Sequence, residues 1–224
     1  MEQQEKPIHL NENDTPYLYE PFRNKMPENR PRPVKKENTL NAWQGLLAFA
    51  FLMFAFNVIG IPFVTVGGMY GNALDEILVF MIGSVLVVRA LHIPLKEVFT
   101  VKKPDGAGIL GTVLMWYVTY RGVLALFLLM EWIFPQEYAS LSESMDSSMA
   151  GLSYLGELLV VALTPAICEE ALHRGLLQYS LRGIRKKWVI LLWMGVYFGA
   201  FHMSLIRFLP MMMMGIVLSY VRMK

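Results

Sequence analysis

Residues 42–66 read AWQGLLAFAFLMFAFNVIGIPFVTV, a continuous apolar stretch without a single charged side chain. A helix that crosses the hydrocarbon core of a bilayer needs about 20 mainly apolar residues, and this stretch exceeds that length. Its apolar residues form a block, whereas a half-buried strand would alternate them with polar residues. The stretch therefore predicts a transmembrane helix.

Five further apolar segments follow it along the chain. Backbone amides in lipid have no water to bond, so each segment is expected to be helical. The composition agrees, because 55% of the residues are hydrophobic and only 17% are charged, too few for the charged shell of a soluble domain. We predict an all-α, polytopic transmembrane bundle with about six spans, at 42–66, 73–91, 107–133, 151–180, 188–206 and 208–222.

The first forty residues differ from the rest of the chain. They are rich in Pro, Asn, Glu and Lys and contain no apolar run. Such a segment buries too little apolar surface to offset the entropy of ordering it. We expect residues 1–40 to form a disordered cytoplasmic tail and residues 41–224 to form the transmembrane domain.

The connections between the apolar segments alternate in charge. Residues 67–72 and 134–150 contain no Lys or Arg, whereas the connections on the other side are basic. Cytoplasmic loops are enriched in Lys and Arg, so the basic side and the N-terminus are predicted to be cytoplasmic. Arg207, near the outer end of the fifth segment, is the exception. The net charge of +2 is too small and too scattered to indicate a nucleic-acid partner. The basic residues of the connections predicted to be cytoplasmic are Lys96, Lys102, Lys103, Arg182, Arg185, Lys186 and Lys187.

The fourth segment contains a dense group of ionisable residues, Glu169, Glu170, His173 and Arg174. Charged side chains inside a membrane are costly, so each one is a functional hypothesis. Residues four apart on a helix share a face. Glu169 is therefore expected beside His173, and Glu170 is expected to form an ion pair with Arg174.

The fifth segment contains one buried polar candidate, His202. Glu169 precedes the basic turn 185–187 by roughly 16 residues and His202 follows it by roughly 15, which places both about 22–24 Å from the turn. An antiparallel hairpin would bring carboxylate and imidazole to the same depth, where they can meet around a water molecule or a metal ion. The alternative is that both groups serve helix packing alone.

Two motifs in this region resemble a known family. Residues 169–178, EEALHRGLLQ, resemble the EExxxR motif of the CPBP family of intramembrane proteases, also called CAAX prenyl proteases or Abi (abortive infection) proteins. Residues 198–202, FGAFH, resemble its second motif, FxxxH. The resemblance covers about residues 150–224 and implies packed transmembrane helices around a polar cavity, in a bacterial plasma membrane.

The resemblance also implies an activity. The expected function is an intramembrane endopeptidase that hydrolyses a peptide bond of a membrane-associated or prenylated substrate. Glu169 would activate water as general base, aided by His202, while Glu170 and Arg174 would position that carboxylate and bind the substrate backbone. A divalent metal such as zinc would be held by Glu169 and His202, with His173 as a weaker candidate ligand. The expected partners are membrane lipid and a peptide or protein substrate.

The chain departs from the family pattern in two ways. Position 173 is usually aromatic in the family but is His here, and no His follows His202. In the family, a later His followed four residues on by Asn or Asp completes the site. We therefore expect the family region to be C-terminally incomplete and the chain as written to be catalytically weak or inactive, since losing oxyanion stabilisation costs about 10²–10³ in rate.

Two other functions stay open at this stage. One is a non-catalytic membrane protein of the same fold, such as a bacteriocin-immunity protein or a regulator of a partner. The other is a transport subunit, which would need charges along one path through several spans. In this sequence the charges concentrate on the segments that precede and follow the basic turn, which disfavours transport.

Overall fold

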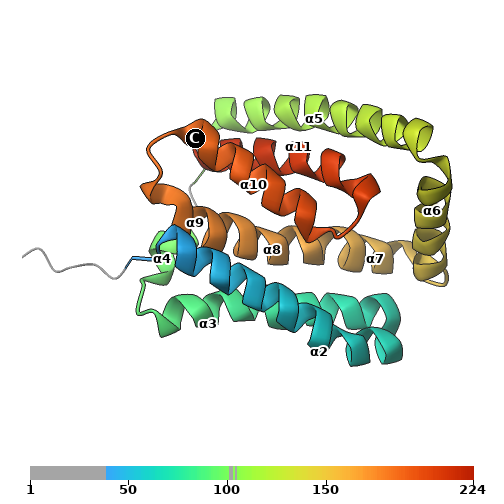
Figure 1. The fold of residues 1–224 in the computed structure, drawn as a ribbon, viewed down its shortest axis with the longest axis horizontal. Helices are drawn as coiled ribbons and strands as arrows, with labels where there is room; N and C mark the ends of the chain where they lie inside the picture. Colours follow the sequence, from blue (N-terminus) through green and yellow to red (C-terminus); the bar gives the residue numbers. More distant parts are fainter. Residues whose placement is uncertain (1–38, 101–102, 104) are drawn as a thin grey trace, which may run out of the picture. The chain divides into compact units, whose positions relative to one another are not determined.

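The computed structural model describes residues 39–100, 103 and 105–224. Within these residues the secondary structure is entirely helical, without a strand (Figure 1), so the predicted all-α fold is confirmed. The expected disordered tail, residues 1–40, lies outside the described residues except for its last two positions. The first described helix begins at Ala42. The preceding residue, Asn41, caps it: the Asn41 side chain accepts from the Gln44 backbone N–H at 2.9 Å, and the Gln44 side chain accepts from the Asn41 backbone N–H.

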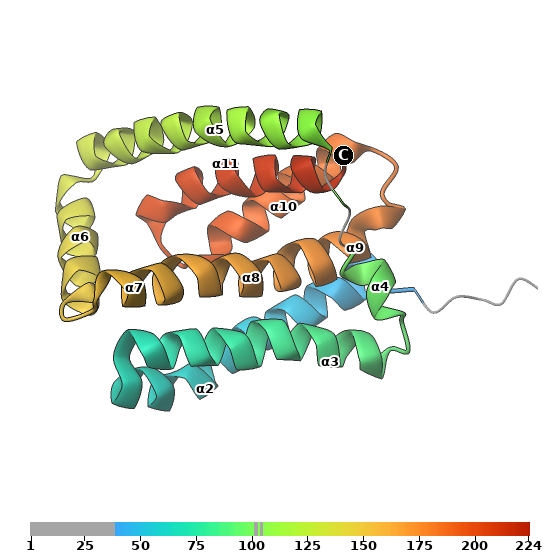
Figure 2. The same ribbon diagram turned by 180° about the vertical axis from the view of Figure 1, so that it is seen from behind.

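The first two predicted spans form a helical hairpin. It consists of α2 (Ala42–Glu76), the π-helical η1 (Ile77–Ile82) and α3 (Gly83–Ala90). The chain reverses at Gly68, whose φ of 55° and ψ of −133° are non-helical and favour glycine. The two arms run antiparallel in both views (Figures 1 and 2). They approach closely at Gly60, where a Cβ would lie 2.5 Å from Oδ2 of Asp75.

A short helix, α4 (Leu95–Val98), leads to α5 (Gly106–Ile133) and then to α6 (Pro135–Met149). Pro135 starts α6 at the first helical position, where its missing N–H costs nothing. The axis of α6 makes an angle of 117° with the next helical segment, so α6 lies across the end of the bundle (Figure 2). The polar sequence of 134–150 led us to expect a loop here, whereas the structure has a helix without a buried residue.

The fourth predicted span is one helical rod with π-helical sections. It runs through α7 (Tyr154–Glu157), η2 (Leu158–Leu163), α8 (Thr164–Glu170), η3 (Ala171–Leu177), α9 (Gln178–Ser180) and η4 (Leu181–Gly183). The section η3 begins directly after Glu170 and contains His173 and Arg174. Such π-helical sections occur frequently at functional sites.

The last two helices, α10 (Lys187–Phe201) and α11 (Leu205–Arg222), form a second antiparallel hairpin (Figures 1 and 2). Their backbones approach closely because α10 carries Gly195 and Gly199 on the contact face. A Cβ at these positions would lie 2.9 Å from the Met212 carbonyl oxygen and 2.7 Å from that of Phe208. The predicted span 188–206 is too long, because α10 ends at Phe201 and Ser204 caps the next helix.

The core lies where the rod packs between the two hairpins. Sections α8 and η3 contact α2, η1 and α10. Four large apolar side chains there are fully buried: Phe80, Leu172, Leu176 and Met194. The site residues of the rod are therefore surrounded by apolar helices.

Within the described part of the chain, three helices are long and apolar enough to cross a membrane, Ala42–Ala90, Gly106–Ile133 and Leu205–Arg222, or four if α6 and the rod count as one bent span. The first of these contains both arms of the hairpin at Gly68, and α10 is apolar but only 15 residues long. Each of the six predicted apolar segments corresponds to a helix, although six spans agrees only roughly with this count.

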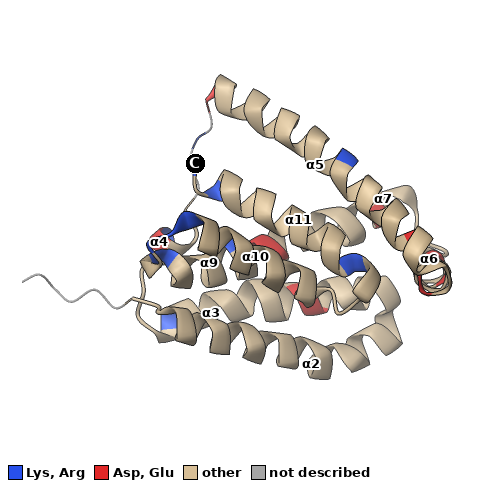
Figure 3. Ribbon diagram, turned by 45° about the horizontal axis from the view of Figure 1, so that its top comes forward, with Lys and Arg blue, Asp and Glu red and all other residues tan. Residues whose placement is uncertain are grey.

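The charged residues of the helix ends and connections gather mostly by sign at opposite ends of the helices, with Arg207 beside α6 as an exception. Basic segments gather around α4, α9 and the end of α11, whereas α6 at the other end carries acidic positions and no basic ones (Figure 3). At the basic end, Arg182 lies 3.9 Å from Glu97, which also accepts from the Tyr179 hydroxyl at 3.1 Å. This separation agrees with the alternation of charge that predicted the topology.

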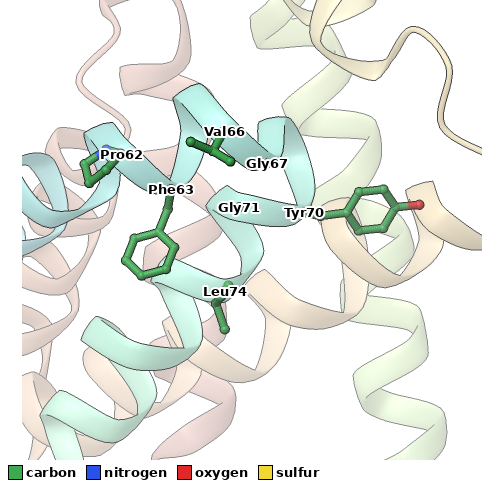
Figure 4. Close-up of a pocket in the computed structure, with 7 residues that line it drawn as sticks. All are labelled: Pro62, Phe63, Val66, Gly67, Tyr70, Gly71 and Leu74. Carbon is green, nitrogen blue, oxygen red and sulfur yellow. The ribbon is translucent and has the colours of Figure 1, made fainter.

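An apolar crevice of about 530 Å³ lies at the Gly68 turn (Figure 4). Its walls come from the two arms of the hairpin and contain no acid or base. Tyr70 points away from the crevice, and its hydroxyl lies where it would meet a Cβ at Gly156 of α7 at 2.6 Å. The crevice is therefore a packing feature of the turn and is separate from the candidate site.

Candidate active site

The predicted ion pair between Glu170 and Arg174 is present. Nε of Arg174 lies 3.2 Å from Oε1 of Glu170, although the geometry falls short of a hydrogen bond. The Arg174 side chain is only 2% exposed, whereas that of Glu170 is 47% exposed. The guanidinium also stacks on Phe198, with Cζ 4.5 Å from the ring centre. Arg174 of the first motif is thus held against the first residue of the second motif.

His173 packs as an aromatic residue. Its Nδ1 lies 3.0 Å from the backbone carbonyl oxygen of Glu169 and donates to it, because a carbonyl can only accept. The ring makes edge contacts with Phe49, Phe198 and Phe201, at centroid distances of 4.8–5.5 Å. Its Nε2 is buried and has no hydrogen-bond partner within the described part of the chain. His173 is therefore the expected neighbour of Glu169, but it bonds the backbone and not the carboxylate.

His202 lies at the tip of the second hairpin. Its Nδ1 donates to the Phe198 carbonyl oxygen at 2.9 Å, which leaves the lone pair on Nε2. The next residue, Met203, has a φ of 44°, a left-handed conformation that costs free energy for a side chain with a Cβ. Strain of this kind is concentrated at functional sites.

A cavity of about 380 Å³ adjoins His202. It lies between α6 and the tip of the second hairpin, where α10, with 15 residues, is much shorter than α5, with 28. One face of α6 covers the space, and Arg207 and Met211 line it from α11. The cavity residues on α6 are Tyr138, Leu141, Ser142, Met145, Asp146 and Met149.

Among the described residues, the side chains of Glu169 and His202 make no direct polar contact with each other. Among the described residues, no hydrogen bond or ion pair links the Glu169 carboxylate to the imidazole, and Glu169 is not among the residues that line the His202 cavity. The two motifs meet instead through Arg174 and His173 on Phe198 and Phe201. A shared hollow for carboxylate and imidazole stays a prediction.

Two buried acidic residues of the first hairpin, Asp75 and Glu76, were not identified as candidate site residues from the sequence. Asp75 is 0% exposed, and neither carboxyl oxygen has a hydrogen-bond partner among the residues that the structure describes. Glu76 is nearly buried and accepts from the Asn72 side chain at 2.8 Å. Two adjacent acids inside the apolar segment 73–91 were the signal that could have identified them.

The described residues do not gather a metal-binding set. No group of three or more His, Cys, Asp and Glu side chains within residues 39–100, 103 and 105–224 could hold an ion. Glu169 and His202 have suitable donor atoms, but two separated side chains do not make the three-ligand arrangement of a catalytic zinc site. The residues present therefore do not fit a metal centre in this structure.

Comparison of the sequence with models of known protein families tests the resemblance that the two motifs suggested. Residues 151–224 match the model described as type II CAAX prenyl endopeptidase Rce1-like. The resemblance to the CPBP proteases is confirmed over this region. The match covers α7 to α11, including both motifs, and together with the apolar helices it indicates an integral membrane protein. No curated protein and no solved structure matches the chain.

Proposed function

We propose that this protein is an intramembrane endopeptidase of the CAAX-protease type, acting on a membrane-associated or prenylated peptide. The observation that carries the proposal is the direct packing of the two family motifs. Arg174 stacks on Phe198, and His173 contacts both Phe198 and Phe201. These contacts hold the helix of Glu169 against the helix that ends at His202, within a largely apolar surrounding.

In the proposed reaction, the Glu169 carboxylate takes a proton from water, and the water oxygen forms a bond to the peptide carbonyl carbon. The C–N bond of the resulting tetrahedral intermediate then breaks, and the proton held by Glu169 passes to the leaving amine. His202 orients the water through the Nε2 lone pair, because its Nδ1 proton is engaged by Phe198. Glu170 and Arg174 position Glu169 and bind the substrate backbone.

The test is hydrolysis of a prenylated, fluorogenic peptide by the purified chain in lipid vesicles. We expect slow turnover that Glu169→Gln reduces about 100-fold or more, as removal of a general base does. Glu157→Gln is the matched control, because it removes the same charge from the same rod three turns away and should leave turnover unchanged. Turnover that survives Glu169→Gln would contradict the proposal, and absence of turnover would favour the non-catalytic alternative.

A further inference from the structure

A second, larger cavity lies at the basic end of the helices, away from His202. Its volume is about 930 Å³, and it opens between the first turns of α5 and the last turn of α11. These two helices pack against each other and both qualify as membrane spans. The ends of membrane spans lie at the level of the lipid headgroups, so the mouth of this cavity is expected at the membrane surface.

The mouth of the cavity is positively charged. Among the described residues, Lys103, Arg222 and Lys224 line it, against one acid, Asp105. Asp105 is engaged by its own helix, since Oδ1 accepts from the Gly108 backbone at 2.7 Å. Arg222 donates to the backbone carbonyls of Thr100 and Val98 and pairs with no carboxylate among the described residues. The fixed groups therefore leave an excess of positive charge facing the cavity.

The wall that α5 contributes to the cavity consists mainly of small or apolar residues. Gly108, Gly111, Thr112 and Met115 follow the spacing of one helix face along α5. A Cβ at Gly111 would meet nothing within 4 Å, so the wall borders open space. The cavity thus joins a cationic mouth to a slot that continues along an apolar helix, the pattern of a molecule with an anionic head and an apolar chain.

We propose that this cavity binds an anionic phospholipid, with its phosphate at Lys103 and Lys224 and one acyl chain along the Gly108–Met115 face of α5. Basic pockets between membrane helices bind anionic headgroups by charge attraction at the membrane surface. Charge complementarity and the position at two span ends favour a lipid over a soluble anion. The site is separate from the proposed peptidase site and does not depend on its activity.

The experiment measures binding of phosphatidylglycerol and phosphatidylcholine to the purified full chain in detergent, by native mass spectrometry. We expect preferential binding of phosphatidylglycerol, weakened about ten-fold or more in Lys103→Gln/Lys224→Gln. The matched control is Lys186→Gln/Lys187→Gln, which removes the same charge at the same end but does not line the cavity. Equal binding of the two lipids, or equal losses in the two double variants, would overturn the proposal.

A second variant tests the acyl slot and the source of the phosphate. Gly111→Leu fills open space beside α5 and retains every charge, so the fold should persist. It should weaken phosphatidylglycerol binding while leaving binding of glycerol phosphate unchanged. If glycerol phosphate alone binds as tightly as the lipid in the unmodified chain, the site is one for soluble anions and the lipid assignment fails.

Discussion

The charged side chain of Arg174 is almost fully buried and is held by two contacts. Glu170 supplies the counter-charge at 3.2 Å, and the Phe198 ring supplies a π-face at 4.5 Å. The helical spacing of four predicted the first contact. The second could not be predicted from the first motif alone, because it depends on how α10 packs against η3.

This arrangement makes the two partners unequal. Glu170→Gln leaves a buried guanidinium without its counter-charge, and we expect unfolding free energy to fall by roughly 1–3 kcal/mol, less than for a fully buried pair because Glu170 is half exposed. Arg174→Leu leaves only a half-exposed carboxylate and should cost less. Denaturant unfolding in detergent measures both, and a greater loss for Arg174→Leu would contradict this account.

Asp75 and Gly60 form a second test at single residues. A Cβ at Gly60 would lie 2.5 Å from Oδ2 of Asp75, a side chain that is fully buried. Gly60→Ala should therefore lower the unfolding free energy by about 1–3 kcal/mol. In an Asp75→Ala background the same change should cost little, so the two losses should not add. Additive losses would show that the two residues are not coupled.

The position of His173 shows where sequence reasoning stops. Spacing placed it beside Glu169, and it lies there, but its Nδ1 bonds the backbone carbonyl and not the side chain. A π-helical section changes which side chains face one another, and no residue in the sequence predicts that section. The burial of His173 among Phe49, Phe198 and Phe201 also explains how His occupies a position that is usually aromatic in the family.

At the scale of elements, apolar blocks located every long helix, but the ends of the helices depended on turns. The fifth span was expected to continue to 206, yet it ends at Phe201 because Met203 adopts a left-handed conformation and Ser204 caps the next helix. Helix α6 was missed because its polar sequence resembles a loop. The structure shows that one face of α6 lines the cavity beside His202, a contact that its own sequence does not predict.

The contact between α10 and α11 depends on small residues. Gly199→Ala would place a Cβ 2.7 Å from the Phe208 carbonyl oxygen, and a backbone atom cannot move aside cheaply. We expect a loss of about 1–3 kcal/mol in unfolding free energy. Gly111→Ala is the control: nothing lies within 4 Å of its Cβ, so it should gain up to about 1 kcal/mol from helix propensity. Equal effects of the two changes would refute close packing of the hairpin.

At the scale of the whole molecule, the separation of charge predicts which ends of the helices share one side of the membrane. In a Cys168→Ser background, single cysteines at positions 67 and 148 should react with an impermeant maleimide from one side. Cysteines at positions 96 and 187, at the basic end, should react only from the cytoplasmic side. Labelling of positions 67 and 187 from the same side would contradict the topology.

The most direct test of the account asks whether the two motifs act as one catalytic unit. Peptide turnover would be measured for Glu169→Gln, His202→Gln and the double variant under identical conditions. Residues that act as a unit are strongly non-additive, so we predict that the double variant is no slower than the slower single variant. Losses that multiply in the double variant would show that Glu169 and His202 act separately, and the proposed site would be wrong.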